Sequence, residues 1–120
     1  MSIVDQIGWY LAARMPDVNV SQGLMPAMPD RCLAVFGSGL NAGAEHGMRV
    51  QIRVRGDDSP GMALGDAETT AELLDDFEGL LHADGHYITR VLIESGPSHI
   101  GVDQNQRQEY SVNLRVFACP

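Results

Sequence analysis

The segment from Gly47 to Arg55 constrains the fold of this chain more than any other stretch. Its apolar residues alternate strictly with polar ones, and three of the four polar residues are the arginines Arg49, Arg53 and Arg55. Successive side chains of a β-strand point to opposite faces of the sheet. The pattern therefore predicts a strand with one face in an apolar core and the other carrying guanidinium groups. Such forked cations suit contacts with other proteins better than catalysis, which indicates a structural building block.

Two helices are predicted from apolar residues at helical spacing. The first is expected over residues 2–14, with Ser2 as its N-cap. The second is expected over about residues 67–82, after a capping Asp66 and before a closing Gly85. Its apolar stripe consists of Leu73, Leu74, Phe77, Leu80 and Leu81.

Further strands are predicted by short apolar or alternating runs between turn residues. They are expected over residues 32–36, 88–94 and 110–118, with a brief strand over 18–20 and glycine- or proline-rich loops over 37–43, 56–61 and 95–108. This order of elements predicts one α+β domain over residues 1–120. Two helices are expected to pack on a mostly antiparallel, mixed sheet of about four strands.

The acidic composition limits the classes of partner. The 120 residues carry 16 acidic side chains against eight basic ones, all of them arginine, for a net charge of −8. This argues against broad contact with nucleic-acid phosphates or an anionic membrane surface. No apolar run approaches the ~20 residues needed to span a bilayer, and no signal peptide is visible. We therefore expect a reducing cytoplasm, with the thiols of Cys32 and Cys119 free.

A metal site is the first chemical possibility considered. His82 and His86 have a ligand-compatible spacing, but Gly85 separates them and no cysteine is near. His82 also complements a helix dipole without a metal. His46 and His99 lie in glycine-rich segments and are expected to be solvated.

Two further segments resemble a dinucleotide-binding loop and a calcium-binding loop, but each lacks residues or elements that such a loop requires. Gly37-Ser38-Gly39 is not followed by the helix that a dinucleotide-binding loop opens. Asp103, Asn105 and Glu109 lack the glycine and the glutamate of a calcium loop. We therefore expect no catalytic residue, no metal and no cofactor. A small ligand- or metal-binding domain using His82 and His86 is kept as the alternative from another class.

Two faces of opposite charge are expected. Arg115 joins the three arginines of the alternating segment in a cationic sheet patch, because its own strand also alternates. The second helix carries an acidic face made of Glu68, Glu72, Asp75, Asp76 and Glu78. Acidic helix faces are ordinarily solvated and need no partner. The arginines of the sheet are different, because threonine or lysine would serve equally well on a face that is only exposed to solvent. We hypothesise that Arg49, Arg53 or Arg115 meets Glu72, Asp75 or Asp76 of a neighbouring copy.

Three blocks in a fixed order carry a family resemblance. They are Pro29-Asp30-x-Cys32, then Val50-Gln51-Ile52-Arg53-Val54-Arg55, then Gly96-Pro97-x-x-Ile100-Gly101-x-Asp103-x-x-x-Arg107-x-Glu109-Tyr110-Ser111-Val112-Asn113. Over residues 26–118 the chain thereby resembles the minor capsid proteins of long-tailed bacteriophages, a family similar to the tail terminators.

The resemblance implies a structural virion protein, assembled in the host cytoplasm, that forms a hexameric ring. Such a ring caps the head-proximal end of the tail tube, stops its polymerisation and serves head–tail joining. The implied partners are other copies, the tail tube protein and a neck or head-completion protein, while genomic DNA crosses the lumen without specific binding. The segment 96–109, with Asp103 and Arg107, is expected to project as a contact arm. Another neck component, such as a head-completion or stopper protein, is the alternative.

Overall fold

The computed structural model describes residues 3–41, 47–57, 59–75, 82–83 and 86–119. Six strands form one mixed sheet in the spatial order β1-β2-β3-β6-β5-β4. β1 runs parallel to β2, and the other neighbouring pairs are antiparallel. The strands are β1 (Asn19–Gln22), β2 (Cys32–Asn41), β3 (Met48–Arg55), β4 (His82–Ala83), β5 (His86–Val102) and β6 (Gln108–Cys119).

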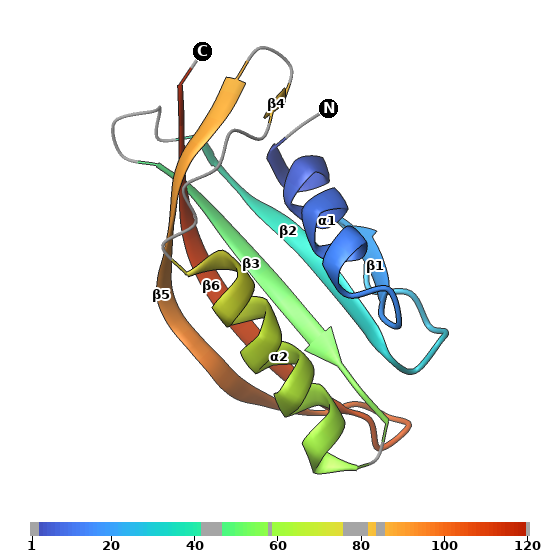
Figure 1. Ribbon diagram of the computed structural model, residues 1–120. Helices are drawn as coiled ribbons and strands as arrows, with labels where there is room; N and C mark the ends of the chain where they lie inside the picture. Colours follow the sequence, from blue (N-terminus) through green and yellow to red (C-terminus); the bar gives the residue numbers. More distant parts are fainter. Residues whose placement is uncertain (1–2, 42–46, 58, 76–81, 84–85, 120) are drawn as a thin grey trace.

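Two helices lie on the same face of this sheet (Figure 1). α1 (Ile3–Arg14) packs on β1 and β2, and α2 (Pro60–Leu74) packs on β3, β5 and β6. The predicted α+β class is confirmed, although the sheet has six strands instead of about four. The opposite face of the sheet carries no helix from the described part of the chain. Neither described helix has the length and apolar character that crossing a bilayer requires.

β3 shows the predicted alternation. Val50, Ile52 and Val54 are at most 1% exposed and point toward the helices. Burying such a side chain contributes ~1.5–3 kcal/mol, so the apolar side of β3 anchors the core. The residues that complete this core include Ile7 and Leu11 of α1, Ala67 and Leu74 of α2, Leu33 and Val35 of β2, and Val112, Leu114 and Val116 of β6.

The first helix is confirmed over Ile3–Arg14, whereas Ser2, its predicted N-cap, lies outside the described residues. The predicted bounds of the second helix are wrong. α2 begins with Pro60 after Ser59 in the N-cap position; proline suits the first turn, where a backbone N–H has no helical acceptor. Asp66 therefore lies inside the helix and does not cap it. The helix ends at Leu74, with Asp75 as its C-cap. Residues 76–81, predicted as its last turns, lie outside the described residues.

Two segments predicted as loops belong to strands. β2 continues through Gly37 to Asn41, with an irregular register between them. β5 continues to Val102 and stays paired with β6 through several register shifts. Gly96 adopts a φ of 98°, a conformation that favours glycine, and Pro97 is tolerated because bulged edge strands accept proline. The segment 95–108 is thus mostly strand, with a short turn over 103–107.

Candidate functional site

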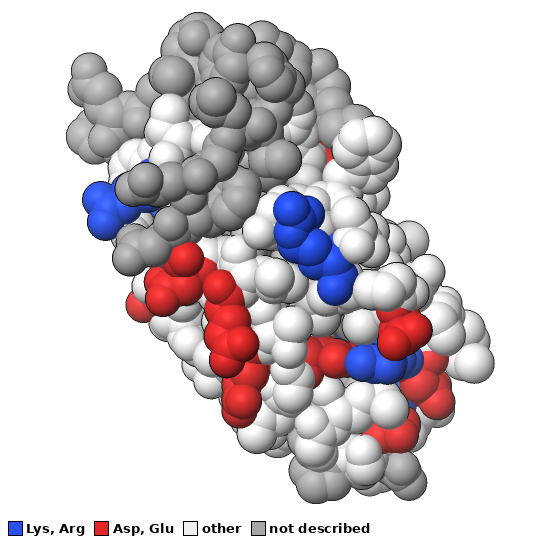
Figure 2. Space-filling model, viewed as in Figure 1, with Lys and Arg blue, Asp and Glu red and all other residues white. Residues whose placement is uncertain are grey.

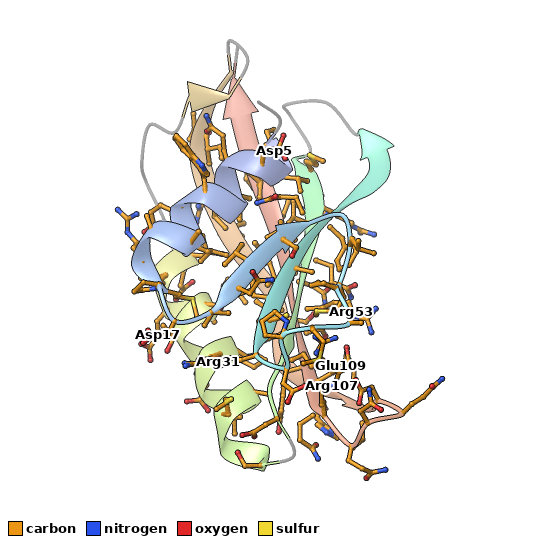
Figure 3. The ribbon with its side chains drawn as sticks, turned by 90° about the vertical axis from the view of Figure 1, so that its right-hand side faces the viewer. Asp5, Asp17, Arg31, Arg53, Arg107 and Glu109 are labelled. Atoms are coloured by element: carbon orange, nitrogen blue, oxygen red, sulfur yellow. The ribbon has the colours of Figure 1, made fainter. Side chains whose placement is uncertain are left out.

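Three predicted arginines lie together on the side of the sheet that faces away from α1 and α2. β3 supplies Arg49 and Arg53, and β6 places Arg115 directly opposite Arg49. The side chains of Arg49, Arg53 and Arg115 are 64%, 39% and 26% exposed. Figure 3 shows Arg53 on this side, away from the helices. We call this surface, with Gln51 and Asn113 between the arginines, the open face.

Two carboxylates of the same chain share the open face. Glu94 lies 4.0 Å from Nε of Arg49 and 3.2 Å from Nη2 of Arg115, which offsets the repulsion between two like charges in opposite positions. Nη2 of Arg53 donates to Oε1 of Glu109 at 3.4 Å. Exposed ion pairs contribute ~0–1 kcal/mol. Among these described residues, the open face therefore carries three guanidinium groups against two carboxylates.

A depression of about 490 Å³ lies on the open face. It crosses β2, β3, β6 and β5, and its lining includes Phe36, Arg49, Gln51, Glu94, Ser95 and Asn113. Gln51 donates to Asn113 at 3.3 Å, and Asn113 donates to Ser95 at 2.9 Å. These bonds hold a polar floor beside one aromatic ring and one guanidinium group.

Arg55 does not belong to this exposed patch, which corrects the prediction. The residue is 3% exposed. Its Nη2 donates to the Pro29 carbonyl at 2.7 Å, and its Nε donates to the Asp30 carbonyl at 3.0 Å. Nη2 also lies 3.4 Å from Sγ of Cys32, a free and buried thiol. Arg55 thus fastens the loop before β2 onto the sheet.

Arg107 fastens the same loop to the turn between β5 and β6. Its Nη1 donates to the Ala27 carbonyl at 2.6 Å and to Oδ1 of Asp30 at 3.2 Å, and its Nε donates to Oδ2 of Asp103 at 2.7 Å. The Arg107 side chain is 8% exposed. Desolvation lowers the pKa of Arg107, but the bonds to Asp103 and Asp30 outweigh it, so the pKa is raised.

Asp103 organises the turn itself. Its Oδ1 accepts hydrogen bonds from the backbone N–H groups of Asn105 and Arg107, both at 2.9 Å. Desolvation raises the pKa of Asp103, but the hydrogen bonds from Arg107 and Asn105 outweigh that effect and hold the pKa below its ordinary value. The chain's own donors therefore occupy this carboxylate and hold the turn together.

The three sequence blocks converge at this point of the fold. The first supplies Asp30 and Cys32, the second Arg55, and the third Asp103 and Arg107. Figure 3 shows Arg107 and Glu109 close to Arg53 at this end of the sheet. The family resemblance implies that Asp103 and Arg107 lie on a projecting arm. Their observed contacts are within the chain and brace the β5–β6 turn.

The predicted acidic partners lie in the other layer of the molecule. Glu72 and Asp75 are exposed on α2, and Figure 2 shows acidic side chains gathered along this helix. Asp76 lies outside the described residues. The sheet separates these acids from the open face, so one copy of the chain does not bring the two groups together.

The structure tests the predictions for only some of the four histidines. His99 is exposed, as expected, and its Nε2 lies 2.8 Å from Oε1 of Gln108. His82 lies in β4 instead of a helix, and His86 begins β5; their side chains, and the whole of His46, are outside the description. Within the described residues, no group of three histidine, cysteine or acidic side chains is placed to hold a metal ion.

Comparisons with known proteins agree with the sequence blocks. A family model described as bacteriophage tail terminator protein matches residues 11–117. A solved structure whose title states no function is 17% identical, with a TM-score of 0.50 over 97% of this chain and 91% of its own. That likeness shows the fold alone. The comparison with curated proteins gives no match.

Proposed function

We propose, because this chain belongs to the bacteriophage tail terminator family, that it forms a ring at the head-proximal end of the tail tube. The protein is a structural component of the phage tail. In the proposal the ring has six copies, stops polymerisation of the tube protein and presents a surface to a neck or head-completion protein. Genomic DNA passes through its lumen without specific binding.

The observation that carries the proposal is the unlike chemistry of the two faces of one subunit. A closed ring uses heterologous contacts, in which one patch of each copy meets a different patch of the next. Here the open face offers the guanidinium groups of Arg49, Arg53 and Arg115, whereas α2 offers the carboxylates of Glu72 and Asp75. The two patches are complementary in charge and lie on opposite sides of the subunit.

Arg53 is the arginine best suited to receive a carboxylate from outside. Its contact with Glu109 is long, at 3.4 Å, and its buried Nε has no acceptor among the described atoms. Nε is buried and lies out of reach of an outside carboxylate. The exposed part of Arg53, whose side chain is 39% exposed, can take a second carboxylate in a shorter, charge-assisted pair. We therefore place Arg53 at the centre of the proposed contact.

The substitution Arg53→Glu tests this contact. It should raise the protein concentration at half-assembly about tenfold or more, because it sets like charges against the acids of α2. Ring formation is measured by sedimentation and by electron microscopy of purified tail tubes with the protein added. Arg53→Glu combined with Glu72→Arg should restore assembly by exchanging the charges.

Three outcomes would contradict separate parts of the proposal. If the Arg53→Glu protein forms normal rings, the proposed charge contact is wrong, but the proposed ring still stands. Tubes that elongate without limit in the presence of the wild-type protein, and never carry it at one end, would remove the terminator function. Binding to a head vertex alone would assign the chain to another neck component.

A further inference from the structure

Trp9 is the most exposed large apolar side chain among the described residues, at 71%. It is also the chain's single tryptophan. Ile7 and Leu11, two residues before and after it, are buried against the sheet. At 3.6 residues per turn, a two-residue step rotates the side chain by roughly 200°. Trp9 therefore points directly away from the core, on the outer side of α1.

The neighbours of Trp9 on α1 leave room for close contact. Ala12 and Ala13 are also exposed and carry no side chain beyond a methyl group. Tryptophan is enriched among interface hot spots, where a large rigid ring enters a pocket in the partner. The outer face of α1 thus presents one protruding ring.

The depression on the open face offers the space and the chemistry for an aromatic side chain. Its volume of about 490 Å³ lies within the range of roughly 300–1,000 Å³ typical of ligand pockets and exceeds that of an indole ring. Phe36 offers an aromatic contact, and Arg49, 64% exposed, offers a cation for the face of the ring. The carboxylate of Glu94 supplies an acceptor for the indole N–H.

We propose that Trp9 of one copy inserts into the depression on the open face of the next copy. This inference rests on the proposed ring and names the side chain that joins its subunits. α1 and α2 lie on the same face of the sheet (Figure 1), so the junction also directs the acids of α2 toward the neighbouring arginines. Because knob and depression lie on opposite sides of one subunit, each copy uses both, and the contact repeats head to tail.

A second copy of this chain suits the depression better than an unrelated partner. The depression lies beside the guanidinium group of Arg49, which is 64% exposed, and the helix layer carries the exposed carboxylates of Glu72 and Asp75. The open face and the helix layer are therefore complementary in charge. Each subunit supplies one Trp9 and one depression, so the two are present in equal number, as a closed ring requires.

Intrinsic fluorescence provides the first test, because Trp9 is the only indole in the protein. As the wild-type protein assembles, the emission should shift to shorter wavelength. Trp9→Ala should raise the half-assembly concentration about thirtyfold or more, the usual loss at a tryptophan hot spot. Leu24→Ala is the matched control, since Leu24 is 66% exposed and lies off α1; it should assemble as the wild type does.

A mixing experiment isolates one junction. Ser95→Phe places a ring in the depression and should obstruct it while keeping Trp9, whereas Trp9→Ala keeps the depression. Each variant alone should remain monomeric. When Trp9→Ala protein is titrated into Ser95→Phe protein, the emission of the latter should shift to shorter wavelength, and a dimer that cannot extend should form. Asn105→Phe, at the exposed β5–β6 turn, is the control for added bulk and should still assemble.

The outcomes separate this inference from the ring itself. Wild-type rings with unshifted Trp9 emission, or Trp9→Ala rings at wild-type concentrations, would overturn the junction and leave the ring standing. No shift in the titration at saturating Trp9→Ala protein would also overturn it. Failure of the wild-type protein to cap tail tubes would instead overturn the proposed function.

Discussion

At the scale of single residues, burial separates the roles of arginines that look identical in the sequence. Arg49 and Arg55 occupy equivalent positions of the same alternating strand. Arg49 is 64% exposed beside the depression, whereas Arg55 is 3% exposed under the loop before β2. The difference arises because residues 23–31 fold across one end of the open face and place two carbonyl groups on Arg55.

Removal of the two side chains should therefore have very different effects on stability. Arg55→Ala removes the Arg55 donor from the Asp30 carbonyl and leaves the Pro29 carbonyl with the Cys32 thiol alone, and an unsatisfied group costs ~1–3 kcal/mol. We expect a loss of about 2 kcal/mol in the free energy of unfolding. Arg49→Ala, the same change on the same strand, should stay within about 0.5 kcal/mol. Urea unfolding of both variants measures this, and equal losses would contradict the fastening role.

At the scale of elements, the sequence predicted β3 and α1 well because their patterns are local. Alternation and helical spacing alone place Val50, Ile52, Ile7 and Leu11 in the core, where they are found. Two of the wrong predictions involve proline. Pro60 was assigned to a loop although it opens α2, and Pro97 was assigned to a loop although β5 absorbs it in a bulge.

The candidate site was predictable only in part, because its decisive contacts are distant in the chain. Strand alternation identified the arginines of the open face. Nothing local indicates that Arg107 binds the Ala27 carbonyl, 80 residues away, or that the loop before β2 covers Arg55. The depression is equally nonlocal, since four strands contribute to it. The exposed Trp9 follows from the helical phase of α1 and could have been found from the sequence.

The β5–β6 turn should lose stability in acid through Asp103. Its pKa is lowered in the folded protein, so its contribution is complete above the unfolded pKa of ~3.9 and is lost as the pH falls through the folded value. Asp103→Asn should lower the melting temperature at pH 7. The gap between the variant and the wild type should narrow below about pH 4.

Thermal unfolding monitored by circular dichroism between pH 7 and pH 2.5 measures this narrowing. Asp17→Asn, an exposed acid outside the turn, is the control and should give a small difference throughout. A gap between Asp103→Asn and the wild type that stays constant to the lowest pH would show that the Asp103 charge does not support the turn.

At the scale of the whole molecule, assembly has to overcome the repulsion between acidic subunits. Each copy carries a net charge of −8 and is 23 Å across its short axes, which sets the spacing of copies stacked face to face. The Debye length is ~30 Å at 0.01 M salt and ~8 Å at 0.15 M. Net repulsion therefore reaches a neighbour at the lower salt concentration and is largely screened at the higher one.

Salt should consequently strengthen ring formation before it weakens it. Between 0.01 and 0.15 M NaCl the half-assembly concentration should fall, because long-range repulsion is screened while contacts at 3–4 Å between partly buried groups are screened much less. Toward 1 M, where the Debye length is ~3 Å, the arginine–carboxylate contacts should weaken as well, leaving the apolar junction of Trp9. Sedimentation across this salt series locates the minimum of the half-assembly concentration. A half-assembly concentration that rises steadily from the lowest salt would mean that local ion pairs, and not the net charge, govern association of the subunits.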